Sequence, residues 1–167
     1  MALKQADDWD RTGETVYLNV DADVFSTSPL DALVAGLKNK IHVNYLGPES
    51  GRFSAHFSLG SFKHSSSADS AILQYVELIE RLPDSARRDW NDSQHRAFNI
   101  GIQAGVRPRQ CEFAIGASTV AAAARVDASI TVTVYAAEPT TSGNGDIRPR
   151  SRPTNRSTRT GRKRPAG

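Results

Sequence analysis

The stretch S-I-T-V-T-V-Y-A-A (129–137) decides the fold class of this chain, because its apolar and polar side chains alternate residue by residue. A two-residue period is typical of a strand that buries one face of a sheet and exposes the other. The inward side chains are predicted to be Ile130, Val132 and Val134, and the outward ones Thr131, Thr133 and Tyr135. The sequence therefore predicts a one-sided sheet, with helices on its apolar face.

The segments before this stretch repeat the alternation and are separated by capping and turn signals. Strands are expected near residues 15–24, 41–46, 53–59, 98–102, 111–115 and 129–137. Helices are expected from Pro29 to Asn39, from Ala68 to Leu82 and from Ser118 to Val126, and a short extra helix over 84–92 would seat Trp90. The order β-α-β-β-α-β-β-α-β predicts an α+β fold with a six-stranded, largely antiparallel sheet and three helices on one face.

Composition divides the 167 residues into three regions, a flexible arm (1–13), an α+β domain (14–138) and a disordered Arg-rich tail (139–167). With 38% hydrophobic residues, the chain can bury a core. The single cysteine, Cys111, excludes an internal disulfide and is expected to fill space inside the core. No apolar run approaches the ~18 residues of a membrane span, and the acidic N-terminus lacks a secretory signal. The expected location is the cytoplasm.

Charge is distributed unevenly between the domain and the tail. Residues 1–138 hold 13 basic and 17 acidic side chains, a net charge of −4, while the tail holds eight basic residues and Asp146, a net charge of +7. Spaced arginines without aromatic residues neutralise phosphates without reading bases, or form a solvating extension. The candidate residues for anion or nucleic-acid binding are Arg148, Arg150, Arg152, Arg156, Arg159, Arg162, Lys163 and Arg164.

The polar side of the sheet is the candidate contact surface of the domain. Amide, carboxylate and aromatic side chains suit an interface, although any solvated sheet face carries polar residues too. The candidate binding residues are Tyr17, Asn19, Asp21, His42, His56, Asn99 and Tyr135.

Two of these residues raise the question of a metal. A hairpin that closes symmetrically about Glu49 would place His42 opposite His56, within the ~5 Å that separates paired side chains. Asp21 or Asp23 could then add a carboxylate. Two ligands make a poor site, and no H-x-x-H or C-x-x-C spacing supports it. No metal or cofactor is therefore predicted.

Three segments carry a resemblance to known proteins: F-N-I-G-I-Q-A-G (98–105), C-E-F-A-I (111–115) and I-T-V-T-V-Y (130–135). Together they resemble small bacterial α+β domains of uncharacterised function, of the kind found among toxin-immunity-like proteins. The resemblance spans about residues 14–137 and implies no catalytic residue.

Three hypotheses of function remain open. The favoured one is a non-enzymatic protein-binding module, immunity-like or regulatory, whose acidic domain covers a partner. The second is a nucleic-acid-associated protein that binds phosphates through its tail. The third is a metal-dependent enzyme that uses the open sheet face. The chain lacks the G-x-S-x-G, P-loop and G-x-G-x-x-G motifs, so an enzyme is not favoured.

Overall fold

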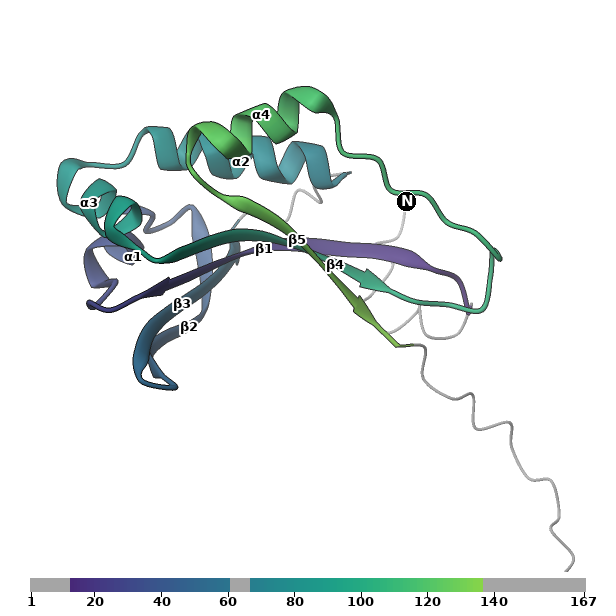
Figure 1. The fold of residues 1–167 in the computed structure, drawn as a ribbon, viewed down its shortest axis with the longest axis horizontal. Coiled ribbons are helices and arrows are strands. Elements are labelled where there is room, and N and C mark those ends of the chain that lie inside the picture. Colours follow the sequence, from purple (N-terminus) through teal and green to yellow (C-terminus); the bar gives the residue numbers. More distant parts are fainter. Residues whose placement is uncertain (1–12, 61–66, 137–167) are drawn as a thin grey trace, which may run out of the picture.

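The computed structural model of the chain describes residues 13–60 and 67–136. Nine elements follow one another along these residues (Figure 1). They are β1 (Val16–Ser26), α1 (Asp31–Gly36), β2 (Ile41–Glu49), β3 (Arg52–Leu59), α2 (Ala68–Glu80), α3 (Asp84–Asp92), β4 (His95–Gln103), α4 (Ala117–Arg125) and β5 (Ser129–Tyr135).

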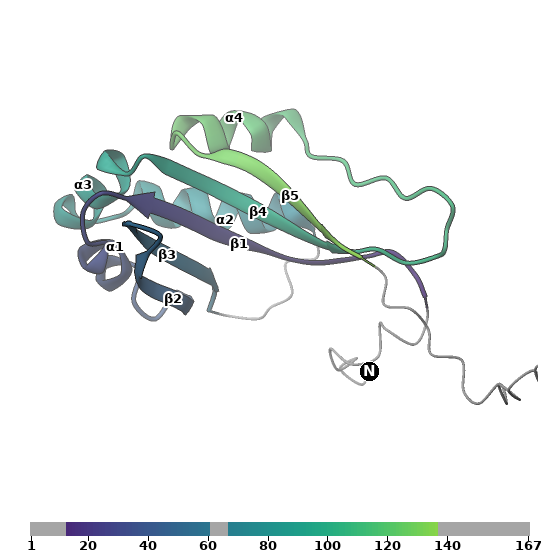
Figure 2. The same ribbon diagram turned by 60° about the horizontal axis from the view of Figure 1, so that its bottom comes forward.

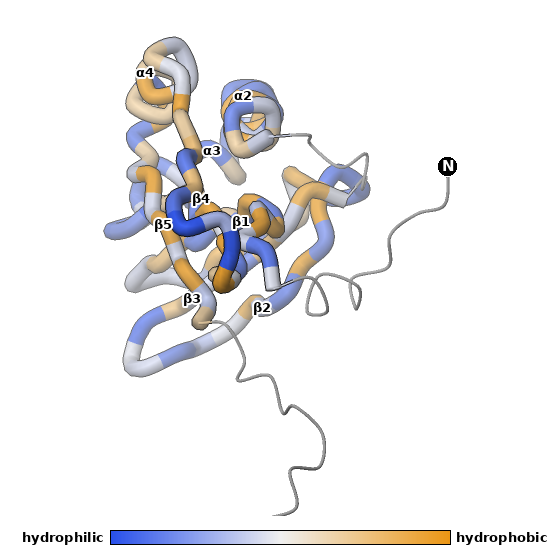
Figure 3. The backbone as a smooth tube through the Cα atoms, turned by 90° about the vertical axis from the view of Figure 1, so that its right-hand side faces the viewer, coloured by the Kyte–Doolittle hydropathy of each residue, from blue (hydrophilic) through white to orange (hydrophobic). Residues whose placement is uncertain are grey.

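The strands form a five-stranded sheet in the order β2-β3-β1-β4-β5. Neighbouring strands are antiparallel except β4 and β5, which are parallel and joined through α4. The first four strands have the split β-α-β arrangement, in which β3 lies between β1 and β2. Viewed from the side, α2 and α4 lie over one face of the sheet, and no described helix covers the other (Figures 2 and 3). The prediction of an α+β fold with a mostly antiparallel sheet is confirmed.

The strand and helix counts differ from the prediction of six strands and three helices. The segment 111–115 forms no strand, because β5 occupies the place beside β4. Within this connecting segment Cys111 is exposed and Phe113 is 40% exposed, so the expectation that Cys111 fills space inside the core was wrong. The fourth helix is α3, the short helix expected over 84–92, and it does bury Trp90.

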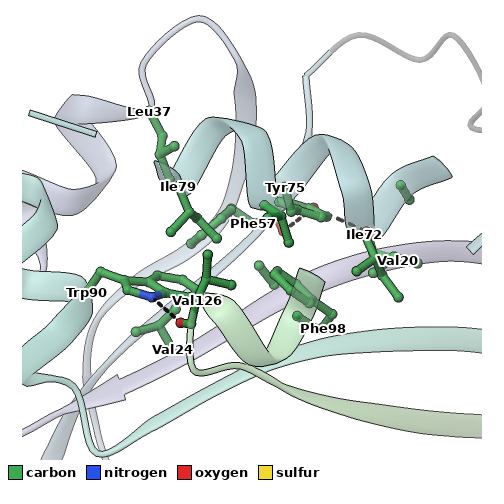
Figure 4. Packing of buried hydrophobic residues seen from close by; sticks show 14 of the residues in the cluster. Val20, Val24, Leu37, Phe57, Ile72, Tyr75, Ile79, Trp90, Phe98 and Val126 are labelled. Carbon is green, nitrogen blue, oxygen red and sulfur yellow. Dashed lines mark hydrogen bonds between the residues drawn. The ribbon is translucent and has the colours of Figure 1, made fainter. Parts of the chain in front are cut away.

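The core lies between the sheet and the helices (Figure 4). Tyr75 of α2 stacks on Phe98 of β4, with 5.4 Å between ring centroids. The Tyr75 hydroxyl lies 3.2 Å and 3.0 Å from the backbone oxygens of Val20 and Phe57, so α2 is tied to two strands. Burial in this apolar layer raises the pKa of the Tyr75 phenol far above its ordinary value.

The last strand, β5, is only partly covered. Ile130 packs against the core, but Val132 and Val134 are 54% and 60% exposed, although both were predicted to be buried. The physical reason is that β5 is an edge strand and runs past the end of the short helix α4 (Figure 1). The alternation therefore predicted the direction of these side chains but not their burial.

Candidate functional site

A chain of polar contacts crosses the open face of the sheet and takes one residue from every strand. Its members, in sheet order, are Glu49 of β2, His56 of β3, Asp23 of β1, Asn99 of β4 and Thr133 of β5. His56 Nε2 lies 3.6 Å from the Glu49 carboxylate, and His56 Nδ1 lies 2.7 Å from Asp23 Oδ1. The Asn99 amide donates to Asp23 Oδ2 at 3.0 Å, and the Thr133 hydroxyl donates to Asn99 Oδ1 at 2.8 Å. Each member is thus held by its neighbour on the next strand.

Asp21 anchors a second group of contacts on the same face. The Asn19 amide donates to Asp21 Oδ1 at 2.9 Å, and the Ser58 hydroxyl also bonds this carboxylate. Asn44 extends the group by donating to Ser58 Oγ at 2.9 Å. Burial raises the pKa of Asp21 above its ordinary value, the bonds from Ser58 and Asn19 oppose this shift, and the nearby charge of Asp23 adds to it.

This raised pKa predicts a pH-dependent effect of the variant Asp21→Asn. The folded protein holds the Asp21 proton more tightly than the unfolded chain, so stability falls as the pH rises from 3.8 through the raised value. An asparagine has no charge to bury. Asp21→Asn should therefore stabilise the protein relative to wild type at neutral pH, and the difference should vanish below pH 3.8. Urea unfolding of both proteins across pH 3–7 measures this difference, and a difference that grows toward low pH would contradict the assignment.

Aromatic side chains surround the polar chain at one end of the open face. Phe25 packs edge-on against His56, with 5.4 Å between centroids, and the Arg52 guanidinium lies 3.7 Å from the centre of the Phe25 ring. Tyr45 approaches His56 from β2, at a centroid distance of 6.0 Å. The Ser54 hydroxyl donates to Glu49 at 2.8 Å, and this bond lowers the pKa of the exposed Glu49 carboxyl. The carboxylates thus lie in an ordered aromatic and polar environment.

The seven candidate residues do not all share this face. Asn19, Asp21, His56, Asn99 and Tyr135 lie there, and so does His42, which pairs with Ser58. Tyr17 does not, because the pairing of β1 with β4 has a bulge between Tyr17 and Asn19. Tyr17 pairs with the buried Ile102 and packs against the core on the helix side. A bulge adds one residue and reverses the side to which every residue beyond it points.

The predicted pairing of His42 with His56 was wrong. The turn consists of Ser50 and Gly51, both with positive φ, so Glu49 pairs with Arg52 rather than lying at the centre of the loop. A second bulge, between Val43 and Tyr45, then places Tyr45 opposite His56. The Tyr45 side chain consequently lies on the open face. The arrangement that suggested a shared metal is therefore not present.

Four residues of the site were missed by the prediction from sequence: Phe25, Tyr45, Glu49 and Arg52. The two-residue turn S-G was the available signal, because it makes Glu49 and Arg52 a cross-strand pair. Extending the first strand to Ser26 would have placed Phe25 on the open side by parity.

Within the ranges 13–60 and 67–136, no group of three or more His, Cys, Asp and Glu side chains could hold a metal ion. Both ring nitrogens of His56 face carboxylates, so the imidazole links two acidic side chains. The described helices include none that is long and apolar enough to cross a membrane.

A flexible arm and a disordered Arg-rich tail were predicted at the two ends of the chain. The tail residues Arg148 to Arg164 lie outside the described residues, as does the arm except for Gly13. The Gly13 carbonyl accepts the backbone N–H groups of Val106 and Arg107.

No protein-family model, curated protein or solved structure matches the chain.

Proposed function

We propose that this protein is a non-enzymatic binding module whose open sheet face holds a positively charged segment of a protein partner. The observation that carries the proposal is the set of three carboxylates, Asp21, Asp23 and Glu49, held in position on a face that no described helix covers. Among the described strand residues, Arg52 is the one arginine or lysine on that face, and it stacks on Phe25. Acidic groups in fixed positions suit lysine and arginine side chains, whose attraction also accelerates encounter.

The surroundings of the carboxylates support a protein as the partner. Tyr45 and Tyr135, on the two edge strands, are 41% and 51% exposed. Leu18, at the bulge in β1, is 37% exposed. Tyrosine and arginine are enriched in protein interfaces, where apolar area surrounds a few oriented polar groups. The expected kind of module is immunity-like or regulatory, and the alternative of phosphate binding concerns the tail alone.

A basic peptide can test the proposal without knowledge of the natural partner. The probe is a short arginine–glycine repeat peptide, titrated into the full chain at about 0.05 M salt and again at about 0.3 M salt. We expect chemical-shift changes that concentrate on the amides and side chains of β1, β2, β3 and β4 facing the open side. Binding should weaken with salt, because charge attraction supplies most of it.

Paired variants separate this face from general acidity. Glu49→Gln combined with Asp21→Asn should weaken peptide binding by about fivefold to tenfold, since each neutralised charge contributes on the order of 0.5–0.7 kcal/mol. The matched control neutralises Glu77 and Glu80 of α2, which are exposed on the helical layer. All variants keep residues 139–167, so the charge of the tail is constant. Equal weakening of peptide binding by both pairs of variants, or chemical-shift changes confined to the helices, would contradict the proposal.

A further inference from the structure

The outer edge of β5 has backbone groups and apolar side chains that the described fold leaves without a neighbour. Among the residues that the structure describes, β5 is the last strand of the sheet and pairs with β4 alone. Ala104 N–H donates to the Tyr135 carbonyl, so the backbone of Tyr135 faces the β4 side. Because backbone groups alternate in direction along a strand, Thr131 and Thr133 face β4 as well. The N–H and C=O groups of Ile130, Val132 and Val134 therefore point outward, away from the sheet.

The side chains of this edge are uncharged. The stretch 128–137 has no Lys, Arg, Asp, Glu or Pro, and Val132 and Val134 are 54% and 60% exposed. An uncharged edge strand with exposed apolar side chains pairs readily with another strand, and natural proteins block such pairing with charges, prolines or bulges.

The opposite edge of the sheet carries those protections. β2 contains Pro48 and Glu49, has a bulge between Val43 and Tyr45, and follows directly after Lys40. One edge of the sheet is thus blocked against pairing and the other is not. The unprotected edge is therefore a feature of β5 and not of both edges of the sheet.

We propose that β5 pairs antiparallel with β5 of a second copy of this chain, joining the two sheets across a two-fold axis at Val132. In this register Val132 faces Val132 of the second copy, and Ile130 faces Val134 of the second copy. These are the residues with outward backbone groups, and each facing pair exchanges two hydrogen bonds. The proposal is independent of the proposed binding of a basic segment.

Charge and symmetry favour a second copy as the occupant. A two-fold axis places every side chain of β5 opposite a side chain of β5 in the second copy. A charged residue on this strand would therefore face the same charge, either directly or one residue pair away. The strand has none. The axis stands perpendicular to the sheet, so both sets of exposed valines meet on the helix side and Thr131 meets Thr133 on the open side. A charged peptide would find no complementary group along this edge.

Sedimentation of the full chain tests the proposal. Over a dilution series from about 100 µM to about 1 µM, the wild type should pass from twice the chain mass of 18.1 kDa to the chain mass itself. Val132→Lys places two ammonium groups opposite each other and should raise the dissociation constant by at least about tenfold. The matched control is Val43→Lys, at a valine that is 38% exposed. It should leave the dissociation constant unchanged, because β2 lies at the opposite edge of the sheet.

A mixing experiment guards against misfolding of the variants. Val132→Lys and Val132→Glu should each be monomeric alone and form a mixed dimer together, because opposite charges then meet at the axis. A wild type that stays monomeric at ~100 µM would overturn the proposal. This holds even if the amide hydrogens of Val132 and Val134 exchange slowly with solvent, because another segment of the same chain could then cover β5. A dimer that is equally stable in Val132→Lys, or that breaks in Val43→Lys instead, would overturn it too.

Discussion

Replacing Trp90 with alanine should lower the free energy of unfolding by about 3–5 kcal/mol, the largest loss expected from a single side chain in this domain. Trp90 is 1% exposed and stacks on Phe98 at a centroid distance of 6.5 Å. Its indole N–H donates to the Val126 carbonyl at 2.8 Å, so it also fixes the C-terminal end of α4 (Figure 4). Removing it opens a cavity and leaves that carbonyl without its donor.

Two further variants divide this loss into its parts. Trp90→Phe keeps an aromatic ring in the core and should cost about 1–3 kcal/mol, mainly for the lost hydrogen bond. Leu73→Ala, at a site 42% exposed on α2, should cost less than about 1 kcal/mol. Urea unfolding of the three variants measures all of these values. A Trp90→Ala protein within about 1 kcal/mol of wild type would show that the indole is not buried as described.

Gly105→Ala should cost about 2–3 kcal/mol, because a methyl group there has no room. A Cβ at this position would lie 2.2 Å from the Glu14 carbonyl carbon and 2.5 Å from the Gly13 oxygen. These are backbone atoms, which cannot rotate away. Relief would have to stretch the bonds from Val106 N–H and Arg107 N–H to the Gly13 carbonyl, and the bond from Gly105 N–H to Thr15 Oγ1.

The matched control for this variant is Gly116→Ala. A Cβ at Gly116 would have its nearest neighbour, Asp69 Oδ1, at the ordinary distance of 3.5 Å. Its expected cost is below about 1 kcal/mol, arising from the N-cap position of α4. Thermal unfolding compares the two glycines directly, and an equal cost at both sites would disprove the close approach of residues 13–15 to Gly105.

Side-chain parity predicted the central part of the sheet from sequence, where the strands pair without interruption. Asp21, His56 and Asn99 lie on the open face as expected, and Ala55, Phe57 and Ile100 lie in the core. The chain of polar contacts itself was not predicted, since its contacts depend on which strands are neighbours. Periodicity within one strand holds no information about sheet order.

The errors in the predicted sheet have local physical causes. The bulge at Leu18 moves Tyr17 to the helix side, and the bulge at Asn44 brings Tyr45 to the open side. Neither bulge has a glycine to mark it in the sequence. The segment 111–115 alternates like a strand, yet forms none because β5 takes the position beside β4. Alternation therefore predicts which segments can pair, and competition for neighbours decides which do.

The nuclear Overhauser contacts of the His56 ring protons test the central claim most directly, namely that an ordered polar and aromatic surface lies on the face opposite the helices. We expect contacts to the rings of Phe25 and Tyr45, whose centroids lie 5.4 Å and 6.0 Å away. Contacts from His56 to Tyr75 or Phe98 in the core, without those to Phe25 and Tyr45, would place the imidazole beneath the helices and contradict the account.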